Sequence, residues 1–133
     1  MDDIFVARLM TSPVETVDSD TLVEDAANLM LDEDIGSVVV IDGDGALAGI
    51  LTSTDFVRIV AERKPKDQTP VSEYMTTDVE TVGAQDLVEA AADRMIQGGF
   101  HHAPVVDDEE GVVGILSTTD LTAYLSDVQD PSP

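Results

Sequence analysis

Two short stretches of the sequence combine hydroxyl side chains with a carboxylate. Residues 49–56 read GILTSTDF and residues 114–121 read GILSTTDL, so three hydroxyl residues precede an Asp in each stretch, at positions 55 and 120. A carboxylate can accept hydrogen bonds from two neighbouring hydroxyls of a sugar such as ribose. Where a helix begins, its free backbone N–H groups also favour a phosphate. The two stretches therefore predict contacts to a sugar and to a phosphate.

The same stretches also fit a structural interpretation. Ser, Thr and Asp are the residues that most often cap the N-terminus of a helix. The recurrence of Asp55 and Asp120 at matching places favours binding, although a duplicated helix cap would recur in the same way. We prefer binding at one or both Asp residues. The candidate phosphate ligands beside them are Thr52, Ser53, Thr54, Ser117, Thr118 and Thr119.

The basic residues near the two stretches differ. Arg58 follows Asp55 by three residues, and it suits either a phosphate contact or a surface ion pair. His101 and His102 have no counterpart near the first stretch. Neighbouring residues of a strand point to opposite faces and no third ligand is suitably spaced, so we expect no metal site. The sequence predicts two unequal sites.

The two stretches belong to a longer internal repeat. A shift of 65 residues aligns residues 6–62 with residues 71–127 without a gap, and 20 of the 57 aligned pairs are identical. Such a match indicates a duplicated structural unit. Each copy opens with a short extended piece, VETV at 14–17 and at 79–82.

A helix is expected next in each copy. Thr21 with Glu24, and Asp86 with Glu89, have the spacing of a capping box. The apolar stripes of these helices are expected to be Leu22, Ala26, Leu29 and Met30 in the first copy and Leu87, Ala91 and Met95 in the second.

Short apolar runs separated by turn residues predict a β-hairpin after each helix, and the hydroxyl runs predict a second helix. Each copy is therefore expected to have the order strand, helix, strand, strand, helix, which is an α+β fold. The expected hairpin strands are 38–41 with 46–51 and 103–106 with 112–116, and the expected second helices are about 55–61 and 120–125. Residues 63–70 are expected to form a linker and residues 128–133 a disordered tail.

The composition limits the classes of partner. Asp and Glu number 28 against 6 Lys and Arg, which gives a formal net charge of -22. Such a surface repels nucleic acid and anionic membranes, so neither is an expected partner. A salt-adapted cytoplasm explains the charge better than a basic partner protein, because concentrated salt screens self-repulsion. With no cysteine and no long apolar run, we expect a soluble cytoplasmic protein.

The chain resembles tandem cystathionine-beta-synthase (CBS) domains, also called a CBS pair or Bateman module. The resemblance covers about residues 6–127 and is carried by LMTSPVETV, YMTTDVETV, HHAPVVD and the two stretches that end in Asp. It implies two β-α-β-β-α repeats, over 1–62 and 71–127, packed sheet to sheet with pseudo-two-fold symmetry. It also implies a homodimer, in which four repeats form a disc.

The resemblance implies a regulatory, energy-sensing module and not an enzyme. Clefts between the repeats would bind AMP, ADP, ATP or S-adenosylmethionine, and the module would signal to a partner protein. No cofactor is required. An alternative is a dimerisation or interaction module whose clefts are vestigial.

By resemblance, Asp55 and Asp120 would bind ribose, and the hydroxyl residues with His101 and His102 would bind phosphate. The expected adenine contacts also fit ordinary core positions, because aliphatic and aromatic residues are buried by default. They are Thr16, Val17, Ile35, Thr81, Val82, Phe100 and Pro104.

Overall fold

The computed structural model describes residues 3–129. The chain forms two compact units, each named here after the Asp that it contains. The Asp55 unit comprises residues 15–79, and the Asp120 unit comprises residues 80–129 together with the N-terminal segment up to residue 14. Both units have the expected α+β composition, with one three-stranded sheet each.

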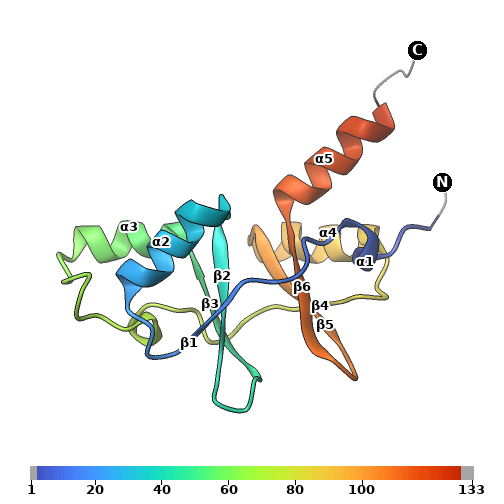
Figure 1. Ribbon diagram of the computed structural model, residues 1–133. Coiled ribbons are helices and arrows are strands. Elements are labelled where there is room, and N and C mark those ends of the chain that lie inside the picture. The colour runs from blue at the N-terminus through green and yellow to red at the C-terminus, as the bar shows by residue number, and fades with distance from the viewer. Residues whose placement is uncertain (1–2, 130–133) are drawn as a thin grey trace. The chain divides into compact units, whose positions relative to one another are not determined.

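The Asp55 unit contains the elements β1 (Thr16–Asp18), α2 (Val23–Glu33), β2 (Ser37–Ile41), β3 (Leu47–Thr52), α3 (Ser53–Ala61) and the short 3-10 helix η1 (Val71–Glu73). Its sheet has the order β1-β2-β3, with β1 parallel and β3 antiparallel to the central strand. The helix α3 follows β3 without a gap, so the end of β3 and the start of α3 form one corner (Figure 1).

The Asp120 unit contains α1 (Val6–Leu9), β4 (Val82–Gly83), α4 (Val88–Gly98), β5 (His102–Asp107), β6 (Gly111–Ser117) and α5 (Thr118–Gln129). Its sheet repeats the same pattern, with β4 parallel and β6 antiparallel to β5. In Figure 1, α5 continues from the end of β6 and extends away from α4. The predicted order of strand, helix, strand, strand, helix is confirmed in both copies.

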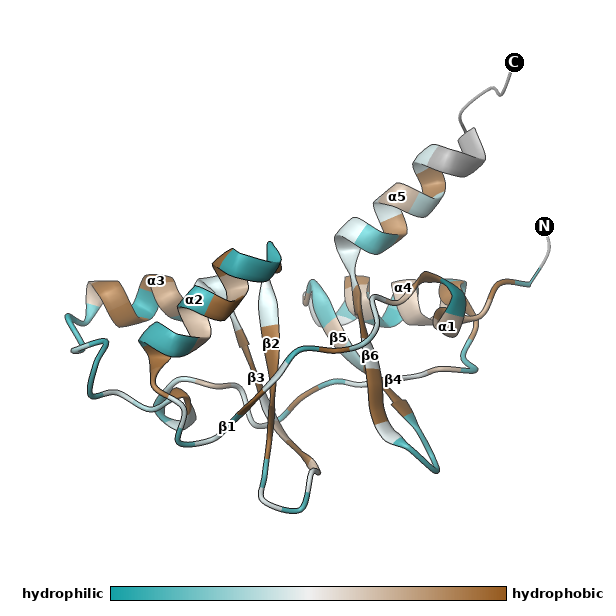
Figure 2. Ribbon diagram, viewed as in Figure 1, coloured by the Kyte–Doolittle hydropathy of each residue, from teal (hydrophilic) through white to brown (hydrophobic). Residues whose placement is uncertain are grey.

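Each unit has its own aliphatic core, and the strands are its most apolar segments (Figure 2). The first helix of each copy buries Val23, Ala26 and Met30 or Val88, Ala91 and Met95. Two members of the predicted stripes are therefore wrong as core positions. Leu22 is half-buried and Leu87 is 40% exposed, because the helices begin one residue later than expected.

The predicted capping boxes at these helices are also wrong. The hydroxyl of Thr21 accepts from the N–H of Asp18 at 3.2 Å, and the carboxylate of Asp86 accepts from the N–H of Gly83 at 2.7 Å. Both side chains therefore stabilise the turn before the helix. The residue at the N-cap is a Leu in both cases and makes no side-chain capping bond.

The first N–H group of α2 and that of α4 each donate to a carbonyl of the segment that leads into the other copy. The N–H of Val23 donates to the carbonyl of Thr69, and the N–H of Val88 donates to the carbonyl of Ile4, each at 2.8 Å. Residues 4 and 69 are equivalent under the 65-residue shift. Each unit thus combines the body of one copy with the leading segment of the other.

The exchange of leading segments was not predicted. It places α1 and η1 in the units opposite to their own copies, and it includes a β-bridge between Thr11 and Ile115 and another between Thr76 and Ile50. Residues 63–70, expected to be a plain linker, include Thr69, whose side chain is only 3% exposed. The limits of the two repeats in the sequence therefore differ from the limits of the two units in space.

Two glycines allow the leading segments to cross the sheets closely. A Cβ on Gly49 would lie 2.6 Å from the carbonyl oxygen of Thr76, and a Cβ on Gly114 would lie 2.9 Å from that of Thr11. No ordinary Cβ tolerates such distances to a backbone atom. The Gly that opens both GIL stretches is therefore required by the crossing.

Some element limits differ from the prediction. The second helices begin at Ser53 and Thr118, two residues earlier than expected, because the hydroxyl residues belong to the first turn. The helix α5 continues to Gln129, so residues 128 and 129 of the predicted disordered tail are helical. Residues 130–133 lie outside the described part of the chain.

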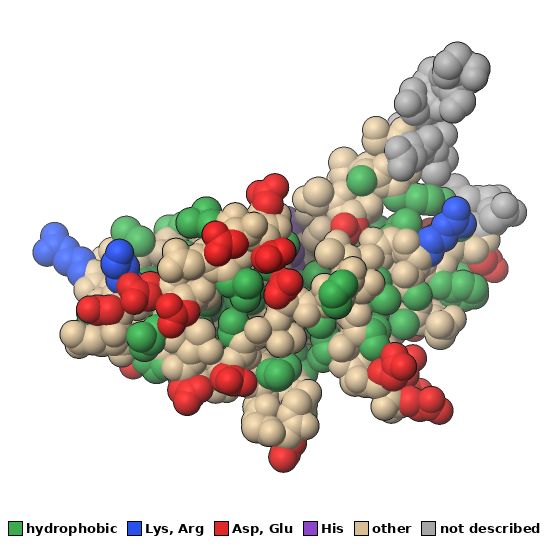
Figure 3. All heavy atoms as spheres, in the orientation of Figure 1, with side chains coloured by type: hydrophobic (Ala, Val, Ile, Leu, Met, Phe, Trp, Pro, Cys, Tyr) green, Lys and Arg blue, Asp and Glu red, His purple; other side chains and the backbone are tan. Residues whose placement is uncertain are grey.

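Acidic side chains are spread over the visible face, and Lys and Arg are few there (Figure 3). Within residues 3–129, every helix is too short or too polar to cross a membrane.

Candidate functional site

Asp55 lies at the corner between β3 and α3 and is only 2% exposed. Its Oδ2 accepts a hydrogen bond from the backbone N–H of Thr52 at 2.9 Å, and the two residues form a capping box at the start of α3. The structural interpretation of this Asp as a helix cap is therefore confirmed. The cap uses one carboxylate oxygen and leaves Oδ1 for another partner.

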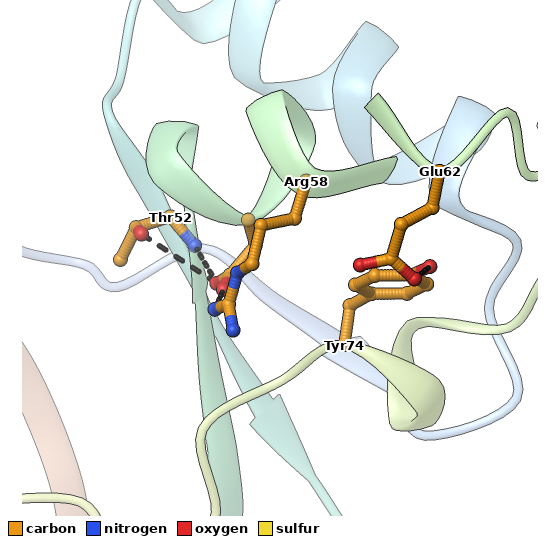
Figure 4. A network of polar contacts seen from close by, with 5 residues as sticks. Thr52, Arg58, Glu62 and Tyr74 are labelled. Carbon is orange, nitrogen blue, oxygen red and sulfur yellow. Dashed lines mark hydrogen bonds and ion pairs between the residues drawn. The ribbon is translucent and has the colours of Figure 1, made fainter. Parts of the chain in front are cut away.

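That partner is Arg58, whose guanidinium forms an ion pair with Oδ1 of Asp55. The two residues stand three positions apart on α3, so their side chains share one face of the helix. The Arg58 side chain is 57% exposed while that of Asp55 is 3% exposed. Figure 4 shows the Arg58 side chain turned toward the start of the helix, where Thr52 lies. A cation at the surface thus covers a buried carboxylate.

Asp120 occupies the equivalent corner between β6 and α5 and is half-buried. Its Oδ2 accepts from the N–H of Ser117 at 2.9 Å and from the Ser117 hydroxyl at 3.0 Å. The N–H of Asp120 donates back to that hydroxyl at 3.1 Å, which completes a capping box. Its Oδ1 accepts from the hydroxyl of Thr11 at 3.2 Å. A neutral hydroxyl therefore takes the place that Arg58 has beside Asp55.

Thr11 is a residue of the site that the sequence did not reveal. It belongs to the leading segment of the first copy and reaches Asp120 only because that segment is exchanged. The available signal was the repetition of Met-Thr at 10–11 and 75–76.

The remaining hydroxyl candidates do not form one cluster with the carboxylates. Ser53 donates to the carbonyl of Gly36 at 3.4 Å, while Thr54 and Thr119 are exposed. Thr118 lines an apolar pocket of about 360 Å3 between α4 and α5, together with Phe100 and His101. The structure thus brings Thr52 and Ser117 to the carboxylates and places Thr118 on another face of α5.

The two histidines lie where β5 begins, beside the start of α5. His102 pairs in register with Ser117, and the N–H of Thr118 donates to the carbonyl of His101 at 3.0 Å. Burial lowers the pKa of His102 below its ordinary value, and the nearby His101 adds to this effect, while the charge of Asp120 opposes it. His102 is therefore uncharged at neutral pH. Among the described residues, no group of three or more His, Asp or Glu is arranged to hold a metal.

The candidate adenine contacts divide by exposure. Thr16 is exposed, and Thr81 is half-buried, at the edge of β4. Val82 and Pro104 are fully buried, so a role in the core fits them better than a contact with adenine. Val17, Ile35 and Phe100 are partly buried, and each packs with one face against the core of its unit.

Comparison with known proteins identifies the repeat. The family model described as CBS domain matches residues 6–62 and again residues 71–127. A 17.7 kDa protein of Acidianus ambivalens is 35% identical over 92% of this chain, which spans 74% of that protein. The homoserine O-acetyltransferase of Methanocorpusculum labreanum is 35% identical over 88% of the chain, but the chain spans only 23% of that enzyme.

Solved structures show the same similarity. The CBS domain pair of protein MJ0100, in complex with 5'-methylthioadenosine and S-adenosyl-L-methionine, has a TM-score of 0.89 and 27% identity, and the match covers 96% of this chain and all of that one. The CBS domain protein PAE2072 of Pyrobaculum aerophilum, complexed with AMP, has a TM-score of 0.84 and 25% identity over 94% of this chain and 98% of that one.

Proposed function

Because the chain belongs to the CBS domain family, we propose that it is a non-enzymatic regulatory module that binds an adenosyl ligand in each of its two units. One observation carries the proposal. Asp55 and Asp120 lie at equivalent corners, and each keeps one carboxylate oxygen outside the helix cap. Related CBS pairs hold AMP, 5'-methylthioadenosine or S-adenosyl-L-methionine, which supports this class of ligand.

In this proposal Oδ1 of each Asp exchanges its present partner, Arg58 or Thr11, for the ribose hydroxyls. A carboxylate is an acceptor only, and it suits a pair of neighbouring hydroxyl donors. The backbone N–H groups and hydroxyls of exposed Thr54 and Thr119, in the first turns of α3 and α5, face a phosphate or another polar group of the ligand. The adenine ring lies along Thr16 and Val17 in one unit and Thr81 in the other. His101 is a further phosphate contact in the Asp120 unit.

The candidate ligands are AMP, ADP, ATP and S-adenosylmethionine. A chain with a formal net charge of -22 opposes the approach of a polyphosphate, and concentrated salt weakens this repulsion. The module signals the bound ligand to a partner protein.

The melting temperature with and without each ligand, in concentrated KCl, tests the proposal. Binding to the native state alone raises the melting temperature, and a ligand at one hundred times its Kd contributes about 2.7 kcal/mol. We expect a shift for at least one ligand with the wild type and none with the Asp55→Ala, Asp120→Ala double variant. Equal shifts for both proteins, or no shift with any of the ligands, would contradict the proposal.

A dimerisation module is the second candidate, because several large apolar side chains are exposed on the helices. Leu31 and Ile96 are equivalent, as are Val60 and Leu125, and the four are between 52% and 79% exposed. Apolar residues that are exposed at matching places of both copies favour association. Sedimentation of the wild type and of a Val60→Lys, Leu125→Lys variant tests a homodimer. A dimer that ignores all four ligands would favour this second candidate.

A further inference from the structure

The Oδ1 atoms of Asp55 and Asp120, which the helix caps do not use, are bonded to their partners with unequal strength. At Asp55 the partner is the guanidinium of Arg58, and at Asp120 it is the hydroxyl of Thr11. Both hydrogen bonds are charge-assisted because the acceptor is a carboxylate, but only the bond from Arg58 adds the attraction between opposite charges. A ribose must displace Arg58 in one unit but only a hydroxyl in the other.

We propose that Arg58 makes the Asp55 unit selective for adenosyl ligands that carry a phosphate, whereas the Asp120 unit also accepts adenosyl ligands without one. The inference rests on the proposed function and names the chemical class that each unit takes. Arg58 thereby becomes a specificity-determining residue.

The exposure of the ion pair decides which group moves. Asp55 is buried and fixed by the N–H of Thr52, while Arg58 lies mostly in solvent at the end of a flexible side chain. When ribose hydroxyls take Oδ1, Arg58 must leave and loses its counter-charge. A phosphate on the same ligand replaces that counter-charge, since a guanidinium binds phosphate as it binds a carboxylate. An adenosyl ligand without phosphate leaves the loss uncompensated.

The next carboxylate along the chain after Arg58 stands at the C-cap of α3. Glu62 is four residues further along the chain, and it accepts a hydrogen bond from the hydroxyl of Tyr74 at 2.8 Å. Figure 4 shows the Glu62 carboxylate turned toward Tyr74. The Tyr74 hydroxyl occupies one acceptor site of that carboxylate, so a displaced guanidinium has Glu62 and the ligand phosphate as competing partners.

The Asp120 unit lacks this device. Ala123 stands where α3 carries Arg58, and it is exposed. His102 is the titratable base whose charge is coupled to Asp120, and its lowered pKa keeps it neutral at pH 7. Among residues 3–129, the carboxylate of Asp120 thus has no permanent cation bonded to it. When ribose replaces Thr11 there, no displaced cation needs a phosphate as its new partner.

Binding of AMP and of adenosine, measured by calorimetry, tests the role of Arg58. The Asp120→Ala variant confines binding to the Asp55 unit, and Arg58→Gln is compared with Lys64→Gln in this background. Lys64 is an exposed residue of the same unit, so its loss changes the net charge equally. We expect Arg58→Gln to weaken AMP and to tighten adenosine by about tenfold each, whereas Lys64→Gln changes both affinities alike.

Tighter binding of adenosine is the decisive result, because a simple phosphate contact would lower the AMP affinity alone. Unchanged or weaker adenosine binding in Arg58→Gln would overturn the inference. Failure of AMP, ADP, ATP and S-adenosylmethionine alike to bind the folded wild type would overturn the proposed function itself. The two failures are therefore distinguishable.

The reverse experiment introduces an arginine into α5 at the position equivalent to Arg58. In an Asp55→Ala background, Ala123→Arg places a guanidinium three residues after Asp120 on an exposed face of α5. We expect adenosine to bind about tenfold more weakly and AMP to become the preferred ligand. An unchanged preference in a variant with the parental melting temperature would contradict the inference.

Discussion

The corners at Asp55 and Asp120 share a backbone but not a chemistry. In both, a carboxylate closes a capping box with the residue three positions before it. The third contact differs, because an arginine of the same helix supplies it in one unit and a threonine of the exchanged segment supplies it in the other. Duplication has preserved the capping box that each helix requires, whereas the partner of Oδ1 has changed.

The largest expected effect concerns the two glycines under the crossing segments. Gly49→Ala should lower the free energy of unfolding by about 3 kcal/mol and Gly114→Ala by about 2 kcal/mol, because overpacking forces the backbone to shift. The order follows from the contacts. The nearest atom to a Cβ on Gly49 is a carbonyl oxygen, whereas on Gly114 it is the flexible sulfur of Met10.

Urea unfolding of the two variants measures this difference. Gly43→Ala is the matched control, since a Cβ there would meet nothing within 4 Å. A larger loss for Gly114→Ala than for Gly49→Ala would show that the two crossings are not ranked by their contacts.

A smaller effect is expected at the third contact of the Asp120 corner. Thr11→Val removes the hydroxyl that donates to Oδ1, and it should lower the free energy of unfolding by about 0.5 to 1 kcal/mol. The equivalent Thr76→Val should change it by less, because Arg58 serves the carboxylate of the other unit. If urea unfolding showed equal losses of free energy for the two variants, Thr11 and Thr76 would not differ in their contribution to the two corners.

The smallest effect concerns mildly acidic pH and arises from a histidine of the Asp120 unit. The pKa of His102 is lowered in the folded state, so the unfolded chain binds more protons as the pH falls below about 6.5. Stability is therefore lost through His102 as the pH decreases, and none is lost above this range. Its counterpart in the first copy is Ser37, which does not titrate in this range.

Melting temperatures between pH 7.5 and pH 5.5 test this direction. The wild type should lose stability relative to His102→Gln on acidification, and the carboxylates affect both proteins alike. A constant difference across this range would mean that His102 titrates normally.

Much of the fold follows from local patterns. The 65-residue repeat, the period of apolar residues and the turn residues between strands placed the hairpin strands and the helix starts within two residues, whereas α5 continues four residues beyond its expected end. The capping boxes at Thr21 and Asp86 failed because the same side chains can serve a preceding turn equally well. Local spacing does not decide between these uses.

The exchange of leading segments could not be predicted for a different reason. Residues 6–11 and 71–76 are similar, and each fits the helix start and the glycine strand of either copy. The choice between them depends on the path of the whole chain. The contact of Thr11 with Asp120 depends on that choice. The pair of Arg58 with Asp55 lies within one helix turn, and a surface ion pair was one of the two alternatives that the sequence left open for Arg58.

The reciprocal exchange also bears on the origin of the molecule. The carbonyls of Ile4 and Thr69 receive the first helix of the opposite copy, so each copy lends its leading segment and borrows the other. An ancestor with a single copy would satisfy the same bonds by pairing with a second chain as a segment-swapped dimer. Gene fusion would then have linked the two chains of the dimer covalently, and the residues at the two corners could then change independently.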